Sequence, residues 1–348
     1  MDAEYYFAGG LQLVRGQGFN EPYLWNYLSD SQGLPSPSHT YWMPLASILS
    51  AFGMIFSGTD TFTAGRMPFI LLAASIAPLT AALSYSLRPR RDLALLAGIL
   101  ASISGFYLPF LSTTATFSPF MFLGAIFFLL SGRLLNHPPI PGSNQKRWNA
   151  YKIPFFLGVI AGLMFLTRSD GLLYLLLAGI VAIIHVRKIL NQPESPNSFQ
   201  GHSFKGLYFL IIDNLSLKFQ LSSITPFMTS TFLVLIGFLT TTTPWFIRNI
   251  IVFSSPFSPG VSRTLWLTNY DQTFSYPASI LTFDHWWASG LTSIFQARLW
   301  SLGQNLQTTL GVQGMIFLFP LVLIAIWRLR QVARVKLAVL TYLLTLVV

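Results

Sequence analysis

Apolar residues fall into long runs separated by short polar or charged segments, and this alternation predicts membrane-spanning helices. A helix of about 20 apolar residues crosses the hydrocarbon core of a bilayer. Eight runs are long enough, some with their neighbours included: 66–87, 93–111, 114–135, 154–167, 171–187, 226–247, 315–327 and 337–348. The pattern therefore predicts an all-α fold, a polytopic transmembrane helix bundle with helical extracytoplasmic loops.

A further apolar run, MPLASILSAFGMIFS at 43–57, is short for a span. Segments of this length are often interfacial or re-entrant. Since the span 66–87 ends at the basic residue Arg88, it is expected to begin outside. We therefore interpret 43–57 as a juxtamembrane or re-entrant helix on the outer side.

Basic residues supply the orientation, because Lys and Arg concentrate in cytoplasmic loops. Fifteen of the 21 lie in four groups: Arg88, Arg90 and Arg91; Arg133, Lys146, Arg147 and Lys152; Arg187, Lys188, Lys205 and Lys218; Arg328, Arg330, Arg334 and Lys336. With these groups inside, the turns at 112–119 and 167–171 and the segment 248–314 face outside.

The same topology places eight of the 11 acidic residues outside: Asp2, Glu4, Glu21, Asp30, Asp60, Asp170, Asp271 and Asp284. This asymmetry indicates that any chemistry takes place on the extracytoplasmic side.

We expect one transmembrane domain over 1–348. Its parts are a first extracytoplasmic loop with juxtamembrane helices (1–60), a transmembrane core with a cytoplasmic linker at 188–225 (61–247), a second extracytoplasmic loop that helps to cover the site (248–314), and C-terminal spans (315–348). The linker is rich in Pro, Ser and Asn and continues into an amphipathic stretch typical of a surface helix. Because the chain begins at an acidic motif and ends within an apolar run, we expect a fragment of a longer protein.

Composition narrows the class of protein. Hydrophobic residues make up 53% of the chain and charged residues 9%, whereas a soluble domain carries about 25% charge. The net charge of +10 follows from the basic loops and does not call for nucleic acid. The absence of cysteine excludes disulfides, thiolate catalysis and cysteine-ligated metals. The sequence therefore predicts an integral protein of the cell or plasma membrane.

The first outer segment, MDAEYYFAGGLQLVRGQGF, carries Asp2 and Glu4 followed by two tyrosines. A carboxylate at a membrane surface can act as general base toward a hydroxyl group, or can hold a divalent metal ion. Composition alone favours the simpler interpretation, a solvated acidic terminus.

Several short motifs change that balance, in the order PYLWNYLSD, PSPSHTYWMPLASIL, SGTDTFTAGRMPFILLA, GLMFLTRSDGLLYLLL and TTPWFIRNIIVFSSPFSPG. Together the chain resembles the GT-C superfamily of membrane glycosyltransferases, in the polyprenyl-phosphate-sugar-dependent branch related to protein O-mannosyltransferases and lipid A aminoarabinose transferases. In that family an acidic motif at the start of the first outer loop supplies the catalytic carboxylate, and D-A-E at 2–4 matches its position. The resemblance implies transfer of a sugar from a polyprenyl-phosphate donor to an extracytoplasmic acceptor, by a single inverting displacement.

On this basis Asp2 is the predicted catalytic base, with Glu4 as a metal ligand or acceptor-orienting partner. Arginine suits bidentate phosphate recognition. The predicted substrate-binding residues are Tyr6, His39, Tyr41, Arg66, Arg168, Asp170 and Arg248. Simpler interpretations compete: interfacial anchoring for each arginine, a local ion pair between Arg168 and Asp170, and an exposed loop position without function for His39. An outer tryptophan pair, Trp286 and Trp287, could cap a sugar or belong to an aromatic belt.

The predicted partners are a polyprenyl-phosphate-linked sugar, a protein, lipid or glycan acceptor, and membrane lipid, with no nucleic acid. No cofactor is required, although a divalent cation remains open; no zinc motif is present. One alternative is a transporter or flippase of lipid-linked sugars, but the predicted spans have almost uncharged interiors and no inverted repeat. A non-catalytic relative is the second alternative.

Overall fold

The computed structural model describes residues 2–31, 33–103, 105–136, 144–190, 217–313 and 316–347. This part of the chain is mostly helical, and the predicted helical class is confirmed. The helices are α1 (Asp2–Val14), α2 (Leu45–Ser57), α3 (Phe62–Leu87), α4 (Arg91–Ser102), α5 (Leu108–Leu111), α6 (Phe117–Asn136), α7 (Asn144–Thr167), α8 (Leu172–Leu190), α10 (Leu217–Phe253), α11 (Pro259–Arg263), α12 (Phe283–Ala288), α13 (Leu291–Thr308), α14 (Phe319–Arg328) and α15 (Ala333–Val347). A two-stranded antiparallel sheet pairs β1 (Asn20–Glu21) with β2 (Ser36–Pro37). Most of the predicted linker at 188–225, together with its expected surface helix, lies outside the described residues.

Four helices in the described part are long and apolar enough to cross a membrane: Phe62–Leu87, Phe117–Leu135, Ser169–Lys188 and Phe227–Phe253. They coincide with four of the predicted spans. The predicted span 93–111 is wrong as a single helix, because α4 ends at Ser102. A 3-10 turn and the short α5 follow. Gly105 has a φ of +52°, a backbone conformation that interrupts a right-handed helix.

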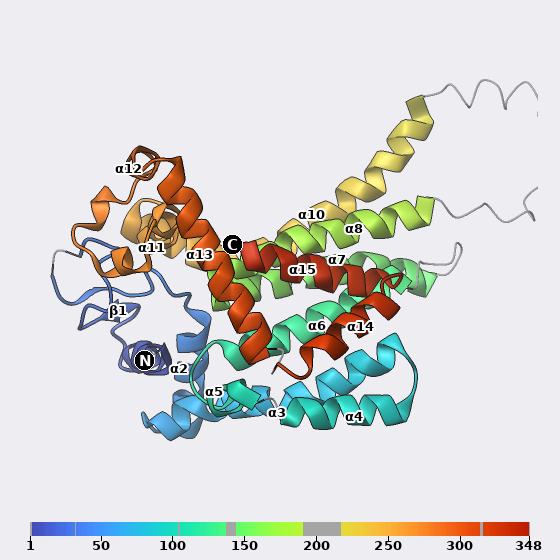
Figure 1. Cartoon of the computed structure of the whole chain (residues 1–348), viewed down its shortest axis with the longest axis horizontal. Helices are drawn as coiled ribbons and strands as arrows, with labels where there is room; N and C mark the ends of the chain where they lie inside the picture. The colour runs from blue at the N-terminus through green and yellow to red at the C-terminus, as the bar shows by residue number, and fades with distance from the viewer. Residues whose placement is uncertain are drawn as a thin grey trace, which may run out of the picture.

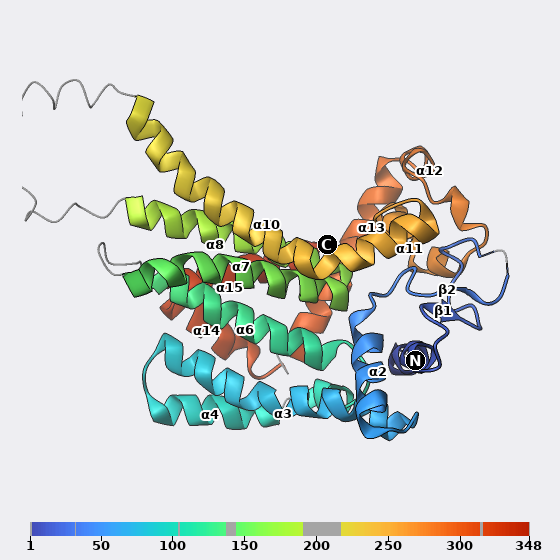
Figure 2. The ribbon, with the colours of Figure 1, turned by 180° about the vertical axis from the view of Figure 1, so that it is seen from behind.

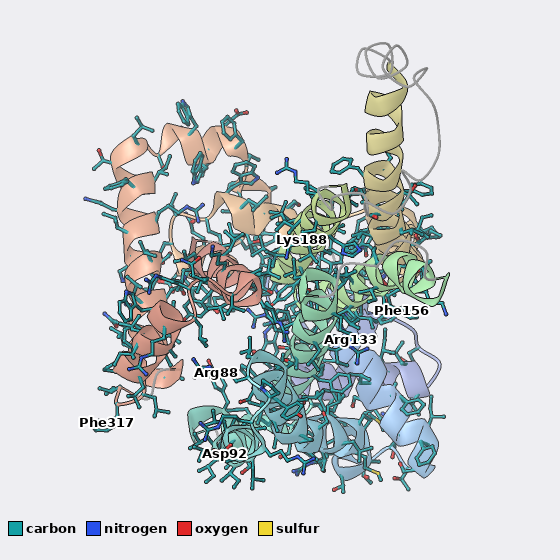
Figure 3. All side chains as sticks on the ribbon, turned by 90° about the vertical axis from the view of Figure 1, so that its right-hand side faces the viewer. Arg88, Asp92, Arg133, Phe156, Lys188 and Phe317 are labelled. Atoms are coloured by element: carbon teal, nitrogen blue, oxygen red, sulfur yellow. The ribbon has the colours of Figure 1, made fainter. Side chains whose placement is uncertain are left out.

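The long helices lie side by side. In Figures 1 and 2, α3, α4, α6, α7, α8, α10 and α15 run roughly along the longest axis of the molecule. The junctions α3/α4, α6/α7 and α14/α15 lie at one end, which we call the basic end. Figure 3 shows Arg88, Asp92, Arg133 and Lys188 there. The described helix ends that flank the predicted cytoplasmic loops therefore share one end of the bundle.

The opposite end, which we call the acidic end, gathers α1, the small sheet, α11 and α12 (Figure 1). The apolar run at 43–57 forms α2, 13 residues long, which lies at a steep angle to α3 at this end (Figure 2). It packs between α1 and α3. A helix in this position fits the juxtamembrane interpretation.

Glycines set the closest contact in the bundle, between α7 and α10. A Cβ at Gly158 would lie 2.0 Å from the carbonyl oxygen of Val234, and one at Gly237 would lie 2.0 Å from that of Phe155. Gly162, one turn further along α7, faces Thr241 in the same way. Small residues four apart allow helix backbones to approach closely, as is common between membrane helices.

Replacing Gly158 with Ala is expected to lower the melting temperature of the detergent-solubilised protein by several degrees. The added methyl group meets backbone, which cannot swing aside, and overpacking of this kind costs about 1–3 kcal/mol. Gly179→Ala on α8 is the matched control, because a Cβ at Gly179 has nothing within 4 Å. Equal melting temperatures for the two variants would contradict this packing.

Candidate functional site

The first turn of α1 presents two carboxylates at the acidic end. Asp2 and Glu4 are exposed, whereas Tyr5 and Tyr6 are 4% and 2% exposed. Side chains three or four residues apart share a helix face, so Tyr5 and Tyr6 anchor the turn that carries Asp2. The hydroxyl of Thr114 donates to the carbonyl of Ala3, which ties the turn between α5 and α6 to the same place.

The turn between α7 and α8 contains the second charged group. The Nε of Arg168 donates to Asp170 at 3.0 Å and its Nη2 donates at 3.0 Å, so the ion pair foreseen from the sequence is present. Within the described residues, Nη1 has no hydrogen-bond partner, and the Arg168 side chain is 47% exposed. Gly171 lets this turn fold back onto α7, because a Cβ there would lie 2.3 Å from the Met164 backbone.

Two tyrosines link these groups. Burial raises the pKa of Tyr6, the charge of Asp2 adds to the shift, and Arg168 opposes it. Burial also raises the pKa of Tyr41. Tyr270 and Asp2 raise it further, while Arg168 again lowers it. Asp2 raises and Arg168 lowers the pKa of both phenols. We call Asp2, Tyr6, Tyr41, Arg168 and Asp170 the Asp2–Arg168 cluster; it contains five of the nine predicted site residues.

Arg66, another predicted phosphate ligand, is engaged elsewhere. On α3, its Nε donates to the carbonyl of Ser112 at 3.0 Å and its Nη2 to the Ser112 hydroxyl at 3.1 Å. It thereby holds the turn whose Thr114 contacts Ala3. In this structure Arg66 supports the cluster indirectly, and its binding of phosphate stays a prediction.

His39 is buried, and the interpretation as an exposed loop residue is wrong. It is 1% exposed, its Nδ1 lies 2.7 Å from the Ser38 hydroxyl, and its Nε2 lies 2.9 Å from the Ser47 hydroxyl. Burial, reinforced by the charge of Arg248, lowers the pKa of His39 to about 3. With both ring nitrogens occupied, the neutral imidazole holds the first outer segment against α2, and its contact with a sugar stays a prediction.

Arg248 lies at the acidic end of α10 and is also engaged. Its Nη2 donates to the carbonyls of Phe19 and Ser38 at 3.1 and 2.9 Å. Its guanidinium lies 4.8 Å from the Trp245 ring centroid. These contacts fasten the first outer segment to the bundle, and the predicted binding of donor phosphate remains untested.

Glu21 was counted from the sequence only as an outer acid, yet it is 8% exposed. Burial raises its pKa to about 7, although Tyr5, Ser36 and Arg248 favour the charged form. Among the described residues, its Oε2 has no hydrogen-bond partner. A cavity of about 10 Å³ beside it has room for about one water molecule. The only sign of this burial in the sequence is that Glu21 lies within an aromatic segment that ends at Trp25.

The two groups of polar residues meet at adjacent tyrosines. The backbone N–H of His39 donates to the Tyr5 hydroxyl at 2.7 Å, and the rings of Tyr5 and Tyr6 are in edge contact with centroids 5.7 Å apart. The buried network around Glu21 and His39 therefore holds α1 through Tyr5, and the next residue, Tyr6, belongs to the Asp2–Arg168 cluster.

The segment 248–314 contacts the segment 1–60, and its covering role stays a prediction. Arg263 and Asp30 form an ion pair at 2.9 Å, and the backbone N–H of Ala278 donates to Asp30 at 2.6 Å. Tyr270 approaches Tyr41 closely enough to influence its pKa. Of the two tryptophans of α12, Trp286 packs against Trp266 with ring centroids 5.8 Å apart.

A metal site built by the protein finds no support in this arrangement. Among the residues that the structure describes, no group of three or more His, Asp or Glu side chains is placed to hold a metal ion.

The chain matches no protein-family model, and no curated protein or solved structure is significantly similar to it.

Proposed function

We propose that the chain is a membrane glycosyltransferase that moves a sugar from a polyprenyl-phosphate donor to an acceptor on the extracytoplasmic face. The observation that supports this most is the Asp2–Arg168 cluster, in which an exposed carboxylate and a partly exposed guanidinium act on the same phenols. A base for the acceptor and a cation for the leaving group are the two requirements of the reaction. The resemblance of the motifs to GT-C enzymes points the same way.

In this proposal Asp2 accepts the proton of the acceptor hydroxyl as that oxygen attacks the anomeric carbon. The bond from that carbon to the phosphate oxygen breaks in the same step, so the sugar is inverted and the polyprenyl phosphate leaves with the electron pair. The Asp2 side chain is exposed at the start of α1. No covalent sugar–enzyme intermediate is needed.

Arg168 stabilises the phosphate charge that grows as the donor bond breaks. Asp170 accepts hydrogen bonds from Nε and Nη2 and thereby orients the guanidinium. In this proposal Nη1 donates to the donor phosphate. The hydroxyls of Tyr6 and Tyr41 are kept protonated by their raised pKa values. They can donate hydrogen bonds to sugar or phosphate oxygens.

The proposed location is a cell or plasma membrane, with the acidic end outside. Because the chain has no cysteine, single introduced thiols report sidedness cleanly. In intact cells, an impermeant maleimide is expected to label cysteine at Ser275 and not at Arg88; both positions are exposed. The reverse pattern would overturn the orientation, which rests on the positive-inside rule.

Arg168→Lys is expected to lower kcat/KM for the donor about tenfold to a hundredfold. Lysine keeps the charge but not the fork that Asp170 orients, and a hydrogen bond to a charged group contributes about 1.5–3 kcal/mol. The matched control is Arg15→Lys, an exposed arginine paired with Asp60 at 2.9 Å. If Arg168→Lys has the wild-type kcat/KM, this arginine is an interfacial anchor and not a phosphate ligand.

The function itself is tested by incubating purified protein and membrane extract with defined polyprenyl-phosphate sugars. Every acceptor releases the same polyprenyl phosphate, so its appearance can be followed without knowing the acceptor. A transferase releases it in proportion to sugar incorporated. A flippase would move the donor between leaflets intact, and a non-catalytic relative would leave it unchanged.

A further inference from the structure

Helix α13 carries a stripe of large apolar side chains that the protein leaves uncovered. Leu291, Phe295, Leu299 and Leu306 are 69%, 64%, 50% and 44% exposed, and Leu310, in the π-helical turn Thr309–Gln313 that follows α13, is 45% exposed. At 3.6 residues per turn, these positions fall within an arc of about 100° on one side of the helix.

Polar side chains lie on the rest of the α13 surface. Toward the bundle, the Asn305 amide donates to the Leu346 carbonyl at 3.0 Å, and the Thr309 hydroxyl contacts that of Tyr342. Away from the stripe, Gln296 and Gln304 are exposed, with the exposed Trp300 between them. The polar contacts with α15 fix the rotation of the helix, and the side chains of the stripe stay exposed.

Lipid is the occupant that fits this stripe. The helix has 18 residues but is not among the helices apolar enough to cross a membrane, and it lies at a steep angle to α6, α7 and α8 (Figures 1 and 2). The next helix in the sequence, α14, also leaves large apolar side chains exposed, among them Leu321 and Trp327. An amphipathic helix in this orientation is typical of the membrane interface.

We propose that α13 lies in the plane of the outer membrane interface, with the stripe from Leu291 to Leu310 inserted among phospholipid acyl chains. This inference rests on the membrane location in the proposed function. It gives the second outer segment an anchor of its own: Tyr270 of that segment, which approaches Tyr41, is held at the surface where a lipid-linked donor enters.

The test uses single cysteines carrying an environment-sensitive fluorophore, in protein reconstituted into phosphatidylcholine vesicles. Phe295 reports the stripe, Gln304 the polar side, and Leu71 on α3, 72% exposed, the surface of a candidate span. The labels at Phe295 and Leu71 are expected to emit at shorter wavelength and to be quenched severalfold more strongly by lipid-borne quencher than the label at Gln304. The label at Gln304 is expected to be quenched by iodide.

Three outcomes would overturn the inference in different ways. An aqueous label at Phe295 with Leu71 in lipid removes α13 from the membrane and leaves the membrane location intact. Aqueous labels at both positions refute the membrane location as well. A label at Phe295 that neither quencher reaches means that protein covers the stripe. The melting temperature of each labelled variant verifies folding, and the loss of an exposed side chain is not expected to change it.

Discussion

Replacing Asp2 with Asn is expected to lower the rate of sugar transfer about 10²- to 10⁴-fold, the usual loss when a general base is removed. Asparagine keeps the shape of the side chain and cannot accept the proton. The first turn of α1 is held by buried Tyr5 and Tyr6, so the variant should fold as the wild type does. Binding of the donor should change little, because Arg168 and Asp170 are untouched.

Two further variants sharpen this prediction. Glu4→Gln should cost less than Asp2→Asn if Glu4 only orients the acceptor. Asp60→Asn is the matched control, because Asp60 is an exposed acid paired with Arg15 outside the Asp2–Arg168 cluster. Single-turnover measurement of polyprenyl phosphate release separates chemistry from product release. Wild-type turnover in Asp2→Asn would eliminate the proposed base.

Replacing Glu21 with Gln is expected to abolish a pH dependence of stability. The pKa of Glu21 is raised from 4.5 to about 7 by burial, so the folded protein holds a proton that the unfolded chain releases. The contribution of the Glu21 carboxyl to the free energy of unfolding is fully present below pH 4.5 and is lost as the pH rises to about 7. The shift of about 2.5 units corresponds to about 3 kcal/mol.

The difference in unfolding free energy between Glu21→Gln and wild type isolates this contribution from other titrating groups. The variant should be close to wild type at pH 4.5 and more stable by up to about 3 kcal/mol above pH 7, because it has no buried charge to accommodate. Glu4→Gln, at an exposed glutamate, should follow the wild-type profile. Parallel profiles for Glu21→Gln and wild type between pH 4.5 and 8 would refute the buried carboxyl.

Periodicity and charge predicted the parts of the fold that depend on local sequence. Long apolar runs became α3, α6, α8 and α10, because burial of apolar surface and backbone hydrogen bonding act together within one segment. The grouping of basic loops at one end followed from their alternation with those runs. The break at Gly105 was missed, because a positive φ at one glycine is not visible in a hydrophobic pattern.

The candidate site residues were named only where motif positions carried them. Asp2, Arg168 and Asp170 come from short motifs; the structure pairs Arg168 with Asp170 at 3.0 Å, and their role as a site stays a prediction. The environment of Glu21 and His39 depends on Tyr5, Ser47 and a helix more than 200 residues further along. Contacts between such distant segments determine burial, and burial determines which acid carries a shifted pKa. A single sequence contains no direct record of them.

The central claim, that a polyprenyl-phosphate sugar binds at the Asp2–Arg168 cluster, is tested most directly by photo-crosslinking. A donor with a photoreactive group on its sugar is irradiated with the protein in membranes, and the modified residues are mapped by mass spectrometry. We predict modification within residues 2–7, 38–42 and 167–171, and its reduction by excess unlabelled donor. Modification confined to the basic end, or not reduced by competing donor, would contradict the account.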